Sequence, residues 1–131
     1  MSATEVKTVL DVADRLFGAI EDSDVAGVEQ LFGPGIAVRK TGDERDNDRR
    51  RSARIIGWFI DSTSDRRYEV LDRQVFEGGF VQQHILHAHG HRGAVVAMRV
   101  CIVIKVGADG LITRIDEYFD PADLAELLAE S

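Results

Sequence analysis

One carboxylate stands out because its neighbours on the same strand face are apolar. The segment from Leu111 to Phe119 alternates as a β-strand does, which places Glu117 on one face with Ile115 and Phe119. Burial in an apolar pocket raises the pKa of a carboxyl group, and such a group can act as a general acid or base. The alternative is a structural carboxylate, held by a buried arginine or by hydrogen bonds from a helix. The sequence favours neither alternative.

His84 is the second candidate for proton transfer. It lies between Gln83 and Ile85 in an apolar part of a predicted strand. Either His84 and Leu86 face the pocket, or Gln83, Ile85 and His87 do, because a slip of one residue exchanges the two faces. We expect His84 to face inward and to act together with the carboxylate. The alternative is a core histidine whose ring nitrogens are satisfied by neighbours such as Gln83.

Six further residues are expected to contact a ligand. Helices laid over a bent sheet leave a cavity at its open end, where small molecules usually bind. The residues assigned to this cavity are Phe17, Lys40, Trp58, Tyr68, Ile102 and Phe119. An ion pair of Lys40 with Glu117 at the pocket mouth would lower the pKa of the carboxyl group. Core packing explains Trp58 and Tyr68 equally well.

The remaining histidines have a spacing that is also found in metal sites. His87, His89 and His91 alternate along one strand, so their imidazoles could converge on one ion. However, no further His or Cys pair supplies the other ligands, and His91 falls in a glycine-bearing turn. We interpret the three as an exposed strand end, and we expect neither a metal nor a cofactor.

The chain that positions these residues begins with helices. Apolar residues at helical intervals predict three helices with a short strand before the last of them, at 2–21, 25–32, 36–40 (the strand) and 49–62. Ser2 and Glu5 have the spacing of a capping box. Gly33, Pro34 and Gly35 end the second helix.

Long strands follow the helices. Alternating residues bounded by glycines predict strands at 67–76, 80–89, 94–106 and 111–119. Short connections favour antiparallel pairing of successive strands. Asp120 and Pro121 then start a short C-terminal helix whose apolar face carries Leu124, Leu127 and Leu128. The order of elements predicts an α+β fold, with three N-terminal helices packed on a strongly curved antiparallel sheet.

The charge of the chain disfavours nucleic acid as a partner. Among 131 residues, 16 are basic and 23 are acidic, which gives a net charge of −7. The basic run Arg49, Arg50, Arg51 and Arg54 is interpreted as a solvated helix face balanced by nearby acidic residues. No apolar run has the roughly 20 residues that a membrane helix requires. The single cysteine, Cys101, fits a reducing compartment, so we expect a cytoplasmic protein.

One predicted strand is apolar on both faces. Val100, Ile102 and Ile104 share one face, whereas Cys101 and Val103 share the other. An antiparallel sheet with one face in water should alternate apolar and polar residues, and the helices can cover only one face. We therefore expect a two-fold homodimer that pairs through the sheet.

The chain resembles a known superfamily. The strand GLITRIDEYFDP near the C-terminus, the order of elements and the segment VQQHIL resemble the SnoaL-like branch of the nuclear transport factor 2-like (NTF2-like) superfamily. The resemblance extends over nearly all of the 131 residues and implies one domain, 1–131, with a cone-shaped fold that commonly pairs through its sheet. It implies no single reaction, because this scaffold carries isomerases, dehydratases, cyclases, epoxide hydrolases and binding domains.

The same resemblance, taken residue by residue, narrows the chemistry. The positions of the three catalytic residues of steroid isomerases hold Leu16, Lys40 and Ile102, so that machinery is absent. Glu117 matches one carboxylate of the epoxide hydrolases, whereas Lys40 and Val38 replace their asparagine and tyrosine. Their arginine–aspartate pair is not retained.

Together these features predict a small-molecule pocket protein. The first hypothesis is a cofactor-independent acid–base enzyme of the isomerase, hydratase, hydrolase or cyclase type, acting on an apolar ligand through His84 and Glu117. The second is a non-catalytic dimeric module that binds a small apolar molecule. The third is an interaction protein whose pocket is filled by its own side chains.

Overall fold

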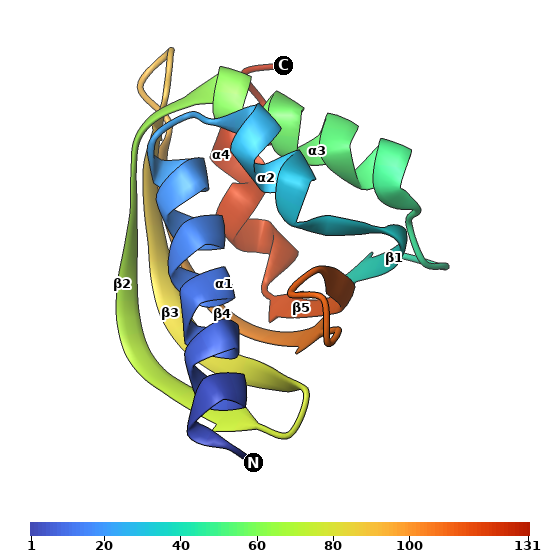
Figure 1. Cartoon of the computed structure of the whole chain (residues 1–131). Helices are drawn as coiled ribbons and strands as arrows, with labels where there is room; N and C mark the ends of the chain where they lie inside the picture. The colour runs from blue at the N-terminus through green and yellow to red at the C-terminus, as the bar shows by residue number, and fades with distance from the viewer.

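Three helices form one layer of the structure, a computed structural model that describes residues 1–131. They are α1 (Ala3–Glu21), α2 (Val25–Leu31) and α3 (Arg49–Ser62) (Figure 1). The predicted cap of the first helix forms, because Ser2 Oγ accepts a hydrogen bond of 3.1 Å from the backbone N–H of Glu5. No helix combines the length and the hydropathy that crossing a membrane requires.

A five-stranded sheet forms the second layer and bends around α1 (Figure 1). Its strands are β1 (Phe32–Lys40), β2 (Thr63–Phe76), β3 (Gly79–Gly90), β4 (Val95–Val106) and β5 (Ile112–Phe119). Their order across the sheet is β1-β5-β4-β3-β2, and the four long strands pair antiparallel in succession, as predicted. The fold is therefore the α+β cone expected for an NTF2-like chain.

The first strand differs from its prediction in length and in partner. β1 begins at Phe32 and runs through Gly33, Pro34 and Gly35, which were expected only to end a helix. It pairs parallel with β5, and its register shifts between Phe32 and Ala37. A proline is tolerated there because β1 is an edge strand, where one side of the backbone needs no partner. This pairing brings Lys40 beside Glu117.

The C-terminal segment is a short 3-10 turn, η1 (Pro121–Leu124), followed by one helical turn, α4 (Ala125–Leu128). Asp120 caps it as predicted, since its side chain accepts a hydrogen bond from Ala122 N. Leu127 is buried, but Leu128 is 53% exposed, so the prediction of an apolar face that includes Leu128 is wrong. The tighter 3-10 turn changes which residues share a face.

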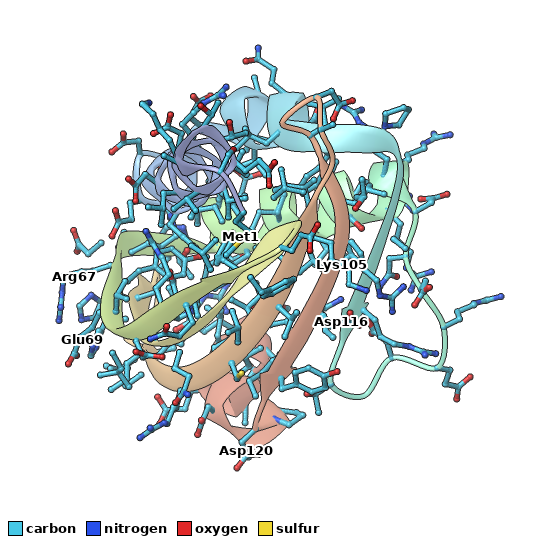
Figure 2. The ribbon with its side chains drawn as sticks, turned by 60° about the horizontal axis from the view of Figure 1, so that its bottom comes forward. Met1, Arg67, Glu69, Lys105, Asp116 and Asp120 are labelled. Carbon is cyan, nitrogen blue, oxygen red and sulfur yellow. The ribbon has the colours of Figure 1, made fainter.

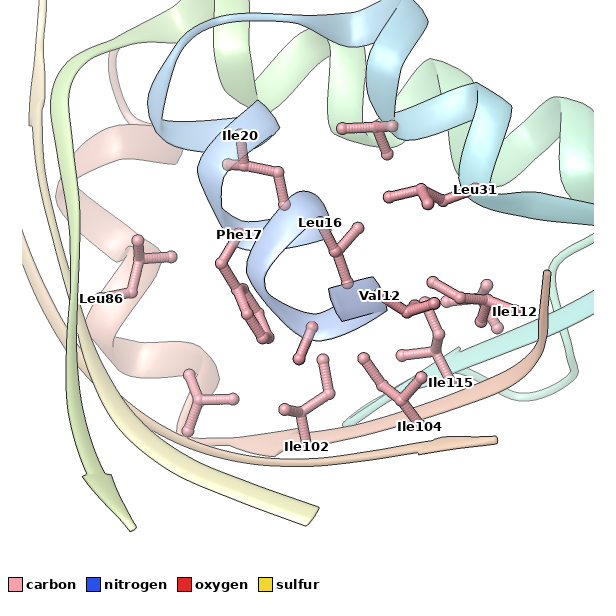
Figure 3. Packing of buried hydrophobic residues seen from close by; sticks show 14 of the residues in the cluster. Val12, Leu16, Phe17, Ile20, Leu31, Leu86, Ile102, Ile104, Ile112 and Ile115 are labelled. Carbon is pink, nitrogen blue, oxygen red and sulfur yellow. The ribbon is translucent and has the colours of Figure 1, made fainter. Parts of the chain in front are cut away.

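The core lies between the helices and the concave face of the sheet. Figure 3 shows Leu16, Phe17 and Ile20 of α1 facing residues of the sheet that include Ile102 and Ile104. Burial alternates along β4, as a strand with one face in the core requires. The opposite face of β4 carries Cys101 and Val103, which are partly buried within the single chain.

A buried arginine joins the ends of two helices to the sheet. Arg66 in β2 donates hydrogen bonds to the carbonyl oxygens of Ile20 in α1 (2.8 Å), Ile60 in α3 (3.1 Å) and Thr63 (2.7 Å). The last carbonyl groups of a helix lack partners within the helix, and the helix dipole favours a cation at that end. Arg66 thus holds α1 and α3 in place over the sheet, and these helices supply the roof of the cavity described next.

Candidate functional site

An apolar cavity of about 190 Å³ lies between the helices and the concave face of the sheet. Of the 20 residues that line it, 17 are hydrophobic. The three others are Lys40 from β1, Ser52 from α3 and Glu117 from β5. A cavity with so few polar groups favours an apolar ligand and fixes where a polar atom of that ligand would lie.

All six residues assigned to ligand contacts line this cavity together with Glu117. They come from six elements, α1, β1, α3, β2, β4 and β5: Phe17, Lys40, Trp58, Tyr68, Ile102 and Phe119. The structure therefore brings these side chains to one place, although they are far apart in the sequence. Their contact with a ligand remains a prediction.

Glu117 is a carboxylate without a partner. Its side chain is partly buried and lines the cavity, and its carboxylate makes neither a hydrogen bond nor an ion pair within the protein. Burial raises its pKa from 4.5 to about 7, while the positive charge of Lys40 opposes that rise. The group can therefore gain or lose a proton near neutral pH.

Lys40 lies beside Glu117 in the sheet but forms its ion pair elsewhere. Its Nζ is 3.2 Å from Oδ2 of Asp43, so the ion pair with Glu117 considered from the sequence does not form. The reason is the turn after β1, which brings Asp43 back over Lys40 through a backbone hydrogen bond between the two residues. Because Asp43 neutralises the ammonium group, Glu117 keeps its raised pKa.

Tyr68 places a phenol in the same cavity. Burial raises the pKa of this phenol, and the negative charges of Glu117 and Glu21 raise it further, so the hydroxyl group stays protonated. The hydroxyl makes no hydrogen bond within the protein. It is therefore free to donate one to a ligand in the cavity.

His84 faces inward, but it is not part of the cavity wall. The residue is fully buried, and its Nδ1 lies 2.9 Å from Nε2 of Gln82, while its own Nε2 has no partner within the protein. Burial lowers its pKa to about 4, and the charge of Arg73 contributes. The imidazole is therefore neutral at physiological pH, which weakens its case as a general base.

The two catalytic candidates are not adjacent. His84 in β3 pairs with Val100 of β4, and Glu117 in β5 pairs with Ile102 of β4. Strand β4 therefore lies between the strands that carry the two residues. Neighbouring strands are about 4.8 Å apart, which places two strands about 10 Å apart. The expected direct action of His84 with Glu117 therefore has no support in the geometry. A separate role for each residue remains a proposal.

Sequence reasoning missed two polar residues of this region. Ser52 lines the cavity, is 6% exposed and has an Oγ without a hydrogen-bond partner, although the sequence placed it only on the buried side of a helix. Gln82, rather than Gln83, is the fully buried neighbour that contacts His84. The alternation of strand β3 was the available signal, because residues 82 and 84 share a face.

The other histidines have separate partners at the surface. His87 bonds Glu69 at 2.9 Å, His91 bonds the backbone oxygen of Asp61 at 2.7 Å, and His89 lies 3.8 Å from Asp65. Figure 2 shows Glu69 on the outer side of the molecule beside β2. No three His, Cys, Asp or Glu side chains gather as a metal-binding group.

Comparison with known proteins identifies one family and many solved structures of similar fold. The model of a family described as the SnoaL-like domain matches residues 13–115. A search of curated proteins gives no match. Among solved structures, the BvnE pinacolase of Penicillium brevicompactum has a TM-score of 0.83 and 12% identity, over 100% of this chain and 97% of its own.

Two further structures show the range of proteins with this fold. An LEH-like epoxide hydrolase of M. tuberculosis has a TM-score of 0.77 and 18% identity, over 95% of this chain and 91% of its own. A SnoaL-like polyketide cyclase of Shewanella denitrificans OS-217, assigned as such without proof of activity, has a TM-score of 0.77 and 9% identity. That match covers 93% of this chain and 97% of the cyclase. At such identities the likeness shows the fold alone.

Proposed function

This chain belongs to the SnoaL-like domain family, and on that basis we propose that its cavity is the site of a cofactor-independent acid–base reaction on a small apolar molecule. The observation that carries the proposal is the unpaired carboxylate of Glu117 in the cavity. A carboxylate without a partner, with a pKa of about 7 in an apolar cavity, is poised for proton transfer at physiological pH. Structural carboxylates are normally paired or hydrogen-bonded instead.

The size of the cavity limits the ligand. An engineered apolar cavity of about 150 Å³ binds benzene, so a cavity of about 190 Å³ fits a molecule with one ring and a few substituent atoms. Proteins of similar fold bear the names pinacolase, epoxide hydrolase and polyketide cyclase, which supports catalysis on an organic molecule. Their diversity leaves the reaction type open.

We assign Glu117 the role of general base. In its ionised form it removes a proton from the ligand, and it returns the proton at a second position or to water. The hydroxyl group of Tyr68, which stays protonated, is a hydrogen-bond donor for a polar atom of the ligand. The apolar walls exclude water and so strengthen both interactions.

Proton exchange tests this role without knowledge of the natural substrate. Cyclohexanone in D₂O exchanges its α-protons when a base removes them, and proton NMR measures the rate. We expect the protein to accelerate this exchange and Glu117→Gln to reduce the acceleration about 10²-fold. The rate should rise with pH through about 7, since only ionised Glu117 is active.

The matched control is Glu77→Gln, which alters an exposed carboxylate in the turn between β2 and β3. This variant should exchange protons as fast as the wild type. If Glu117→Gln is equally fast, Glu117 is not the base. A rate that falls through pH 7 instead would assign Glu117 as a general acid.

A second candidate function is binding without catalysis. It is favoured by the absence of any hydrogen bond that would orient the carboxylate of Glu117, and by the distance of His84 from it. Trp58 lines the cavity, so its fluorescence should report ligand binding. Saturable binding of cyclohexanone without exchange that depends on Glu117 would favour a binding module over an enzyme.

A further inference from the structure

A chain of hydrogen bonds runs from the surface to the imidazole of His84. Asp14 Oδ1 in α1 accepts a bond of 2.8 Å from Arg73 Nη1 in β2. Arg73 Nε in turn donates a bond of 2.7 Å to Gln82 Oε1 in β3. The other end of the same amide, Gln82 Nε2, lies 2.9 Å from His84 Nδ1.

This chain fixes which ring nitrogen of His84 carries the proton. An arginine side chain can only donate hydrogen bonds, so Gln82 must present its oxygen to Arg73 and its NH₂ group to His84. His84 Nδ1 must then accept, and in the neutral ring the proton lies on Nε2. The tautomer of His84 is thus set by Arg73, because its hydrogen bond to Gln82 Oε1 fixes the orientation of the Gln82 amide.

The protonated nitrogen faces the wall of the cavity. Side chains in strands stand roughly perpendicular to the sheet, so Nε2, a distal ring atom, points away from β3 into the interior. There the imidazole packs against the rings of Tyr68 (centroids 4.9 Å apart) and Phe17 (5.5 Å), which both line the cavity. The Nε2–H group is fully buried and has no acceptor within the protein.

Such an unpaired donor is uncommon and costly in a folded protein. Here it lies behind two rings, and the hydroxyl group of Tyr68 is not tied down by any hydrogen bond within the protein. A displacement of the Tyr68 ring would bring the cavity and His84 Nε2–H together. An oxygen atom of a ligand would then reach the donor.

We propose that His84 donates a hydrogen bond from Nε2 to a carbonyl oxygen of the ligand, with Asp14, Arg73 and Gln82 as positioning residues that hold this tautomer. The substrate class is then a cyclic carbonyl compound of one ring. The inference rests on the proposed function, since the ligand is the one whose proton Glu117 removes. Polarisation of the carbonyl group by His84 makes the adjacent C–H proton easier to remove.

Long-range ¹H–¹⁵N NMR of the imidazoles tests the tautomer directly, with the His84 signals assigned from their loss in His84→Leu. We expect Nε2–H in the wild type. In Gln82→Glu the new carboxylate can only accept, so the proton should move to Nδ1. The matched control is Gln83→Glu, which changes the exposed neighbour on the opposite face and should leave the tautomer unchanged. Nδ1–H in the wild type, or no change in Gln82→Glu, overturns the positioning role.

Binding of a matched pair of probes tests the carbonyl contact. Trp58 fluorescence should show that cyclohexanone binds the wild type more tightly than cyclohexane does, and that His84→Leu removes about tenfold of this preference. Gln82→Glu, in which Nε2 becomes an acceptor, should remove it too. If His84→Leu weakens the binding of cyclohexanone and of cyclohexane equally, the contact with His84 is contradicted, but the role of Glu117 is unaffected. If neither probe binds, the ligand cavity itself is contradicted, and the proposed function fails with it.

Discussion

At the scale of single residues, ionised Glu117 lowers the stability of the folded protein, and the proposed reaction requires this ionised form. Its pKa in the folded protein, about 7, lies above the ordinary value of 4.5, so folding favours the protonated form. The contribution of this group to stability is complete below pH 4.5 and is lost as pH rises to about 7. This cost is consistent with the proposed role of Glu117 in proton transfer, because carboxyl groups with raised pKa values cluster at functional sites.

Glu117→Gln should therefore stabilise the protein at high pH. Above pH 7 we expect the free energy of unfolding to rise by on the order of 3 kcal/mol at most, because the neutral amide does not ionise. Urea unfolding at pH 5 and pH 8 measures the change, which should be much smaller at pH 5. The same shift at both pH values would mean that the pKa of Glu117 is not raised.

At the scale of elements, the roof of the cavity depends on how helices end. Arg66 satisfies carbonyl groups at the C-termini of α1 and α3 and has no carboxylate partner. The helices that supply Phe17 and Trp58 to the cavity are thus held by one side chain of β2. Its position could not be read from the sequence, because Arg66 lies between two charged neighbours that suggest a solvated turn.

Arg66→Met should destabilise the protein by about 3 kcal/mol, because it leaves several buried carbonyl oxygens without a donor. Urea unfolding at pH 7 gives the value. The adjacent variant Arg67→Met is the control, since Arg67 is exposed and projects outward beside β2 (Figure 2). A change within about 0.5 kcal/mol is expected for Arg67. Equal effects of the two substitutions would contradict the capping role of Arg66.

At the scale of the whole molecule, the convex face of the sheet has no layer over it in the single chain. Cys101 and Val103 lie there beside Tyr118, which is 57% exposed. The nearby charges of Arg114 and Asp116 are already paired with each other at 2.8 Å. An apolar strip bordered by neutralised charges is suited to the homodimer expected from the sequence, which we retain as a proposal.

Sedimentation velocity at several concentrations tests the dimer. The wild type should sediment as a dimer, and Val103→Glu should be a monomer, because pairing would bury an ionised carboxylate from each subunit. Leu128→Glu, at an exposed position of the C-terminal helix, is the control and should remain dimeric. A wild type that is monomeric at all concentrations overturns the proposal.

The sequence by itself determined the order of the elements and the alternation within the long strands, but not where β1 begins or that Leu128 is exposed. Caps, glycine turns and apolar spacing act between close neighbours in the chain, so the helix that begins after Ser2 and the alternation around Glu117 could be predicted locally. The tertiary structure alone decided which residues meet across the sheet. β4 separates His84 from Glu117, and the rings of Phe17 in α1 and Tyr68 in β2 pack against the imidazole of His84. These outcomes depend on strand register and on contacts between distant segments, which no local pattern specifies.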